Sequence, residues 1–120
     1  MILVDTSVWI DHLRAGDKGL QALLNTGQVL MHPFILGELA CGNLRNRNEV
    51  LTLLNALPRA TVANDYEVLL FIERHSLMGR GIGYIDAHLL GSVALCAPAR
   101  LWTRDKRLAA IAGVLGLART

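Results

Sequence analysis

Short apolar runs alternate along the chain with longer segments in which apolar residues recur at helical spacing. The short runs predict strands at residues 2–4, 28–31, 60–63 and 101–103, with residues 117 and 118 as a fifth, edge strand. Helices are predicted between them, among them 33–40, 85–96 and 106–115. Thr6 or Ser7 is expected to cap the first helix, Pro33 occupies a favoured first helical position, and Gly79 ends the helix capped by Asn64 or Asp65.

This alternation of strands and helices predicts an α/β fold with a parallel sheet. The strand segments are apolar without polar alternation, which is typical of strands buried on both faces. We therefore predict a three-layer fold in which helices flank a parallel sheet of four or five strands. The 120 residues suit one domain spanning 1–120, because repeats, linkers and low-complexity segments are absent from the sequence.

Composition narrows the class of protein further. Hydrophobic residues make up 52% of the chain and mean hydropathy is +0.38, so the chain can bury a core. No apolar run approaches the roughly 20 residues of a membrane span, and Asp5 interrupts the N-terminal apolar run too early for a secretory signal. Cys41 and Cys96 lie in apolar segments, which predicts buried, reduced thiols in a cytoplasmic protein. A net charge of +2 does not by itself indicate a nucleic-acid-binding protein.

Four carboxylates stand out by their positions. Asp5 directly follows the first strand and Asp105 follows the strand at 101–103, so both lie at the carboxyl edge of the sheet, where α/β proteins form their sites. Glu38 and Asp86 interrupt apolar helical segments, and charged groups are rarely buried without a partner. Each has a simpler interpretation: the three aspartates also suit helix caps, and Glu38 suits a solvated helix face.

Together the four acids predict a metal site. Two carboxylates about 5 Å apart repel each other by roughly 3 kcal/mol at an effective dielectric constant near 20. Four that converge would hold protons or need a cation. An all-oxygen cluster suits Mg²⁺ or Mn²⁺, and a metal held there suits hydrolysis of a phosphodiester bond.

The four acidic segments together also resemble a known family. The opening Val4-Asp5-Thr6-Ser7-Val8-Trp9-Ile10 resembles that of the PIN-domain toxins of the VapC family, and the segments around Glu38, Asp86 and Leu101–Asp105 resemble the other acidic segments of that family, in order. The resemblance implies a Mg²⁺- or Mn²⁺-dependent endoribonuclease that leaves a 3′-hydroxyl and a 5′-phosphate. It implies that the four acids are the catalytic and metal-binding residues, supported by hydroxyl groups at Thr6 or Ser7 and at Thr103.

The resemblance also implies a VapB-like antitoxin that inhibits the enzyme. We place it on an apolar face near Trp9, Leu13 and the second helix, with a basic side chain directed at the acids, and we expect a homodimer to share this surface. Basic residues near the predicted site are candidates for contacts with RNA phosphates, although each also suits a solvated face; they are Arg45, Arg47, Arg80, Arg104 and Lys106.

Two other functions stay open at this point. One is a phosphoacceptor domain of flavodoxin-like topology, but this chain has Asn64 where an aspartate should directly follow residues 60–63, and it has no lysine near Leu117. The other is a catalytically inactive PIN-like module that binds a protein, against which the presence of all four acids argues. The histidines show no metal-ligand spacing, and His88 is only a minor candidate beside Asp86.

Overall fold

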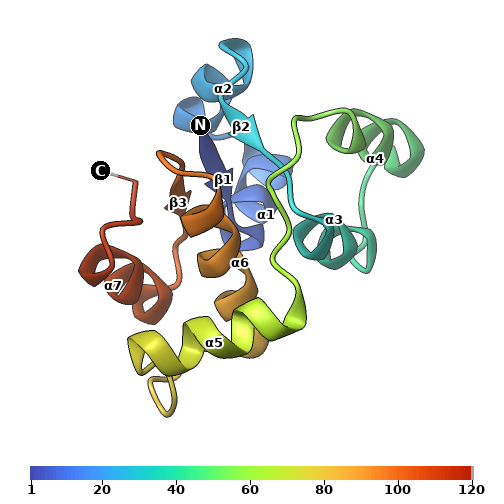
Figure 1. Cartoon of the computed structure of the whole chain (residues 1–120). Coiled ribbons are helices and arrows are strands. Elements are labelled where there is room, and N and C mark those ends of the chain that lie inside the picture. Colours follow the sequence, from blue (N-terminus) through green and yellow to red (C-terminus); the bar gives the residue numbers. More distant parts are fainter. Residues whose placement is uncertain (120) are drawn as a thin grey trace.

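The computed structural model describes residues 1–119, and its centre is a small parallel sheet. Strand β1 (Ile2–Val4) lies in the middle, with β2 (Val29–Leu30) on one side and β3 (Arg100–Trp102) on the other. Leu3 pairs with Leu30 and with Leu101, so the parallel register brings the carboxyl ends of all three strands to one edge (Figure 1).

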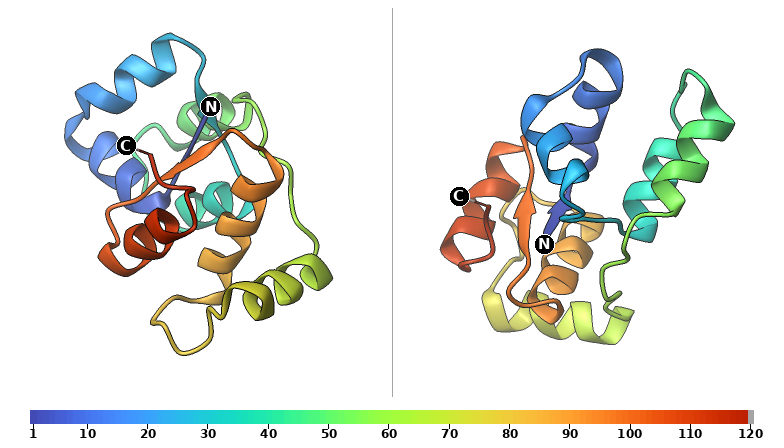
Figure 2. Two further views of the ribbon diagram at one scale, coloured as in Figure 1. Left: turned by 60° about the vertical axis from the view of Figure 1, so that its left-hand side comes forward. Right: turned by 90° about the horizontal axis from the view of Figure 1, so that it is seen from above.

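Helices surround the sheet on all sides (Figure 2). The first two lie on one face and the fifth and sixth on the other, while the third and fourth extend beyond the edge at β2 and the last lies beside β3. Their bounds are α1 Thr6–Ala15, α2 Lys18–Asn25, α3 Pro33–Ala40, α4 Arg47–Asn55, α5 Asp65–His75, α6 Tyr84–Leu95 and α7 Lys106–Val114. No helix among the described residues is long and apolar enough to cross a membrane.

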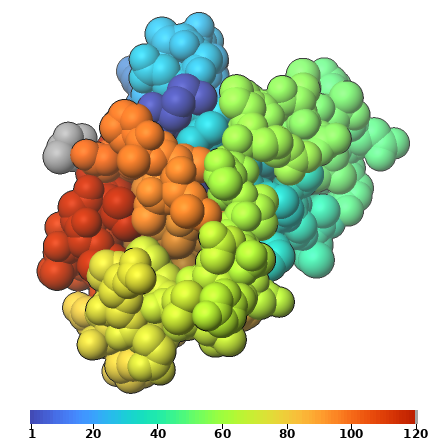
Figure 3. All heavy atoms as spheres, in the orientation of Figure 1, coloured from blue at the N-terminus to red at the C-terminus, as the bar shows by residue number. Residues whose placement is uncertain are grey.

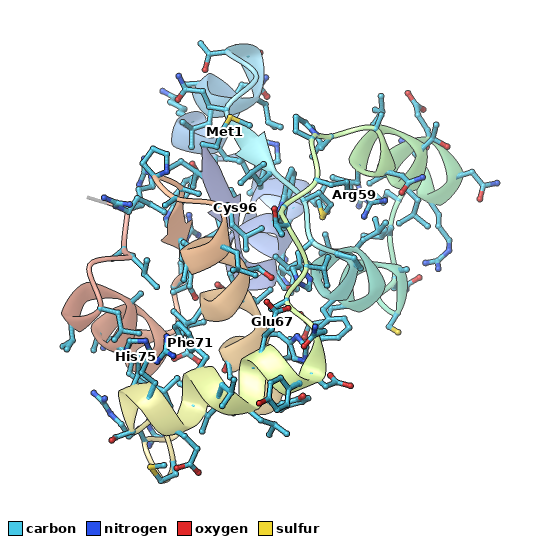
Figure 4. The ribbon with its side chains drawn as sticks, in the orientation of Figure 1. Met1, Arg59, Glu67, Phe71, His75 and Cys96 are labelled. Atoms are coloured by element: carbon cyan, nitrogen blue, oxygen red, sulfur yellow. The ribbon has the colours of Figure 1, made fainter. Side chains whose placement is uncertain are left out.

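The number of strands differs from the prediction of four or five. The segment at 60–63 forms no strand, and only Arg59 just before it makes an isolated bridge, to Met31, while the segment at 117–118 makes another, from Ala118 to Leu101. The segment at 60–63 does not extend the sheet because its backbone N–H groups bond to side chains at α6. The Thr61 N–H donates to Sγ of Cys96, which is labelled in Figure 4, and the Ala63 N–H donates to Oγ of Ser92. Apolar sequence alone therefore overestimated the sheet, because side chains of a neighbouring helix take the hydrogen bonds of a strand.

The ends of the helices follow local signals with two exceptions. Asn64 caps α5 in a reciprocal capping box with Glu67, and α3 begins at Pro33 as predicted. However, Asp5 rather than Thr6 or Ser7 occupies the cap position of α1. Helix α5 ends at His75 and not near Gly79, and its C-cap residue Ser76 has a left-handed conformation with φ of 51°.

The core corrects two expectations about individual side chains. Trp9, assigned from sequence to an exposed partner-binding face, is only 2% exposed, and Leu20 of α2 is completely buried. Both belong to the core that Leu3 and Val4 of the central strand also form. Both cysteines are free, but Cys41 is exposed and Cys96 is half-buried, so the expected burial of the thiols was wrong for Cys41.

Buried His32 gives the fold a dependence on pH. Its ring is fully buried, and burial, with the nearby charges of His88 and Arg59, lowers its pKa from 6.5 to about 4. Below pH 6.5 His32 is therefore protonated in the unfolded chain but stays neutral in the folded chain. The stability of the fold thus falls as the pH drops from 6.5 towards 4. We expect this histidine to contribute a loss of about 2 kcal/mol between pH 7 and pH 5.

Urea unfolding at the two pH values measures this loss. His32 also accepts the Phe34 N–H through Nδ1 at 3.0 Å, so His32→Asn is the matched variant: it keeps a cap acceptor and removes the titrating ring. Its stability should change with pH by about 2 kcal/mol less than that of the wild type. Equal losses in the two proteins would contradict the assignment.

Candidate active site

The four predicted acids come from four separate parts of the fold. Asp5 follows β1, Glu38 lies on α3, Asp86 is in the first turn of α6, and Asp105 stands between β3 and α7. Asp5 is 8% exposed and Asp86 is half-buried, whereas the other two are exposed. The site therefore lies at the carboxyl edge of the sheet, as the strand order predicts.

Asp5 is held by hydroxyl groups rather than used as a helix cap. Its side chain makes no capping bond to α1. Instead, Oδ2 accepts from the Ser7 hydroxyl at 2.9 Å and from the Thr103 hydroxyl at 2.8 Å. The Thr103 oxygen in turn accepts the backbone N–H of Asp105 at 3.1 Å. Two hydroxyl groups predicted to support the site thus join the ends of β1 and β3.

The third predicted hydroxyl group, that of Thr6, connects the start of α1 to α3. Thr6 donates to Oε1 of Glu38 at 2.8 Å, across 32 positions in the sequence. Glu38 is exposed, so the simpler interpretation of a solvated helix face is right about its exposure but misses this contact. Both members of the predicted Thr6–Ser7 pair therefore contact a site carboxylate.

Asp86 shows most directly that the four charges act on one another. Burial raises the pKa of its carboxyl group above the usual range, and the charges of Asp5, Asp105 and Glu38 raise it further. The Gly83 N–H, which donates to Oδ2 at 3.2 Å, opposes this shift. The pKa of Asp86 is raised overall, so the other three acids lie close enough to destabilise its ionised form.

Within residues 1–119 each of these carboxylates uses only one of its two oxygens in a protein hydrogen bond. The bonded oxygens are Oδ2 of Asp5, Oε1 of Glu38, Oδ2 of Asp86 and Oδ1 of Asp105, the last of which caps α7 through the Leu108 N–H. The second oxygen of each remains available. Four available carboxylate oxygens in a mutually repelling set fit a hard divalent cation such as Mg²⁺ or Mn²⁺.

The side chains stop short of a closed coordination shell. Among the described residues, no three histidine, cysteine, aspartate or glutamate side chains are arranged to hold a metal ion as they stand. The aspartates are instead arranged by hydroxyl and backbone donors from their own neighbourhood.

The candidate phosphate-binding residues fall into two groups. Arg104 is bound between the carboxylates of Asp11 and Asp17, at 2.5 Å from the second, so its guanidinium is committed to α1 and to the cap of α2. Arg47 donates to the backbone carbonyl groups of Gly42 and Ala40. The remaining candidates are exposed, and they are Arg45, Arg80 and Lys106.

A groove beside the site replaces the predicted apolar face at Trp9. It encloses about 630 Å³ between α1, α3 and α4. Ile10 and Leu13, 44% and 36% exposed, supply its wall on α1, and Glu38 is the one site acid that lines it. Arg45 also lines it, from the connection between α3 and α4. Leu13 therefore lines a groove and stays a candidate for the partner surface, whereas Trp9 is buried in the core.

Sequence reasoning missed a second polar cluster. Asp65 accepts from the Tyr84 hydroxyl at 3.0 Å and contacts Nε2 of His88 at 3.2 Å, so His88 faces α5 rather than the acids. The sequence holds a signal for part of it, because Tyr84 and His88 are four positions apart on α6 and so share a face. Asp65 enters from another helix, which spacing along the chain does not reveal.

The comparisons with known proteins agree with this arrangement. The PIN domain family matches residues 2–114. The chain is 52% identical over 118 residues to a protein named Ribonuclease VapC32 in Mycobacterium tuberculosis strains CDC 1551 / Oshkosh and ATCC 25618 / H37Rv, and the match covers 98% of this chain and 95% of each relative.

Proposed function

Because the chain belongs to the PIN-domain family, as a VapC-type toxin, we propose that it is a metal-dependent endoribonuclease controlled by an antitoxin. The observation that carries the proposal is the group of four carboxylates from four elements, in which burial, together with the charges of the other three, raises the pKa of Asp86. The phosphoacceptor alternative loses its support, since the PIN family spans residues 2–114.

We assign Asp5, Glu38, Asp86 and Asp105 as the acids that would hold Mg²⁺ or Mn²⁺. When bound, the metal would activate water and neutralise charge that develops on the phosphate. The protein orients the acids: Ser7 and Thr103 fix Oδ2 of Asp5, and Thr6 fixes Oε1 of Glu38. The reaction would be hydrolysis, in which water adds to phosphorus and the 3′-oxygen leaves, giving a 3′-hydroxyl and a 5′-phosphate.

RNA binding needs positive charge around this acidic centre. Arg45, Arg80 and Lys106 are exposed and remain our candidates for contacts with phosphate groups. Arg104 and Arg47 keep this role only as a weaker proposal, because their guanidinium groups already bind carboxylate or carbonyl oxygens of the protein.

The experiment that tests the proposal is cleavage of RNA by the purified protein with and without Mg²⁺ or Mn²⁺. Metal-dependent cleavage supports an active nuclease. Intact RNA under all these conditions, with folded protein, would favour the inactive protein-binding module instead.

The antitoxin is expected in the groove between α1, α3 and α4. Its apolar wall at Ile10 and Leu13 suits an amphipathic segment, and Glu38 at the other wall attracts a basic side chain towards the acids. A homodimer is expected to use a different surface, the exposed apolar residues Tyr66, Leu69 and Leu70 of α5, the helix that lies across the lower part of Figure 3.

We predict that Leu13→Asp weakens antitoxin binding about tenfold or more, since a charge would replace an apolar contact in the groove. RNA cleavage and the mass of the free protein in solution should be unchanged. Affinity is measured by titration with the VapB-like protein expected from the neighbouring gene. Leu95→Asp on α6, at another exposed leucine that lies outside the groove, is the control. Equal affinity of both variants would place the antitoxin elsewhere.

A further inference from the structure

Two partly exposed aromatic rings flank a buried histidine beside the proposed site. Phe34 and Tyr84 are 37% and 45% exposed, and His88 is 2% exposed. The ring centroids of Phe34 and Tyr84 lie 4.8 Å and 4.6 Å from that of His88, both edge-on. We call three side chains the aromatic platform: Phe34, Tyr84 and Asp65. Asp65 belongs to it because its carboxylate contacts both Tyr84 and His88 of α6.

This cluster orients the Asp65 carboxylate through one of its two oxygens. Its Oδ1 receives the Tyr84 hydroxyl at 3.0 Å and lies 3.2 Å from Nε2 of His88. Its Oδ2 makes no hydrogen bond within residues 1–119, and the side chain is 81% exposed. A fixed carboxylate with a free oxygen accepts hydrogen bonds and repels anions, so the aromatic platform suits a planar group that carries an amino group, not a phosphate.

The aromatic platform is carried by helices that also hold two of the four acids. Phe34 and Glu38 are four residues apart on α3, which places them one helical turn apart on the same face. Tyr84 precedes Asp86 by two residues in the first turn of α6, so these two side chains project to different sides of that helix. The two helices that carry Glu38 and Asp86 therefore also carry the two rings.

We propose that Phe34 and Tyr84 stack a nucleobase of single-stranded RNA next to the cleaved phosphate, and that Oδ2 of Asp65 accepts a hydrogen bond from the amino group of that base. Aromatic side chains stack all bases, whereas a carboxylate distinguishes those with an exocyclic amine. Cytosine, adenine and guanine have one, and uracil has none. The proposal rests on the proposed ribonuclease function.

The test measures binding of two single-stranded RNA probes, oligocytidine and oligouridine of about ten nucleotides. It uses the Asp5→Asn background with Mg²⁺ present, so that no probe is cut. We expect oligocytidine to bind severalfold more tightly than oligouridine. Asp65→Asn should abolish this preference, because an amide also donates to the uracil carbonyl. Phe34→Leu, which keeps an apolar side chain, should weaken both probes about tenfold.

Two controls match these changes. Glu73→Gln removes the same charge from α5 outside the aromatic platform, and Leu53→Ala removes an exposed apolar side chain from α4. Both should keep the affinity and the base preference of the parent. Circular dichroism confirms that each variant is folded.

Other results overturn the proposal. Unchanged probe binding in both Asp65→Asn and Phe34→Leu would remove the platform from RNA recognition, even where the wild type cleaves RNA. Altered solution mass, or weaker antitoxin binding with intact probe affinity, would assign the rings to a contact with a second copy or with the antitoxin. Failure of the ribonuclease function itself is a separate result: the wild type would then cleave no RNA with any metal.

Discussion

Replacing Asp5 with asparagine is expected to lower metal-dependent RNA cleavage by about a hundredfold or more while the protein stays folded. Losing an outer-shell partner of a metal ligand alone costs about 10- to 100-fold, and Asp5 is the most buried of the four proposed ligands. The amide can still accept from the Ser7 and Thr103 hydroxyls, so the local structure should persist. Removing one charge also relieves repulsion on Asp86, so the metal-free variant should be at least as stable as the wild type.

Initial rates of RNA cleavage with Mg²⁺ or Mn²⁺, together with thermal unfolding without metal, measure both parts of this expectation. Glu73→Gln also removes one negative charge, but on α5, which carries none of the four acids, so this variant should cleave RNA at the wild-type rate. An Asp5→Asn protein that is free of wild-type enzyme and cleaves at full rate would remove Asp5 from the mechanism. A variant that does not fold would show that the carboxylate is structural.

Trp9→Ala should destabilise the protein by about 3–5 kcal/mol, the usual cost of truncating a large buried aromatic side chain. Trp9 is 2% exposed, and its buried indole N–H has no hydrogen-bond partner among residues 1–119. Trp9→Phe removes this unpaired donor and keeps most of the packing, so its loss of stability should be much smaller. Urea unfolding of each variant measures the difference.

Leu13→Ala on the same helix is the matched surface control and should change stability by no more than about 0.5 kcal/mol. If Trp9→Ala is as stable as this control, the ring does not belong to the core. For the same reason a loss of antitoxin binding in Trp9→Ala would be uninformative about the interface, and Leu13→Asp is the better probe.

The sequence by itself determined the α/β class and the main candidates for the chemistry. Apolar strands at 2–4 and 101–103 end directly before Asp5 and a short turn before Asp105, and parallel pairing brings such positions to one edge. Pro33 and Asn64 mark the starts of α3 and α5 through local backbone chemistry. These features depend on residues close together in the chain, which is why pattern and spacing predicted them.

Only the tertiary structure decided what depends on distant residues. Side chains of α6 took the backbone hydrogen bonds of the segment at 60–63, so the sheet stopped at three strands. Packing buried Trp9 and left Leu13 on a groove. Arg104 pairs with Asp11 and Asp17, which are far from it in the sequence, and Asp65 of α5 contacts His88 of α6. Burial and pairing of this kind are set by the way helices meet, and local sequence periodicity carries no information about the partner that a side chain will meet there.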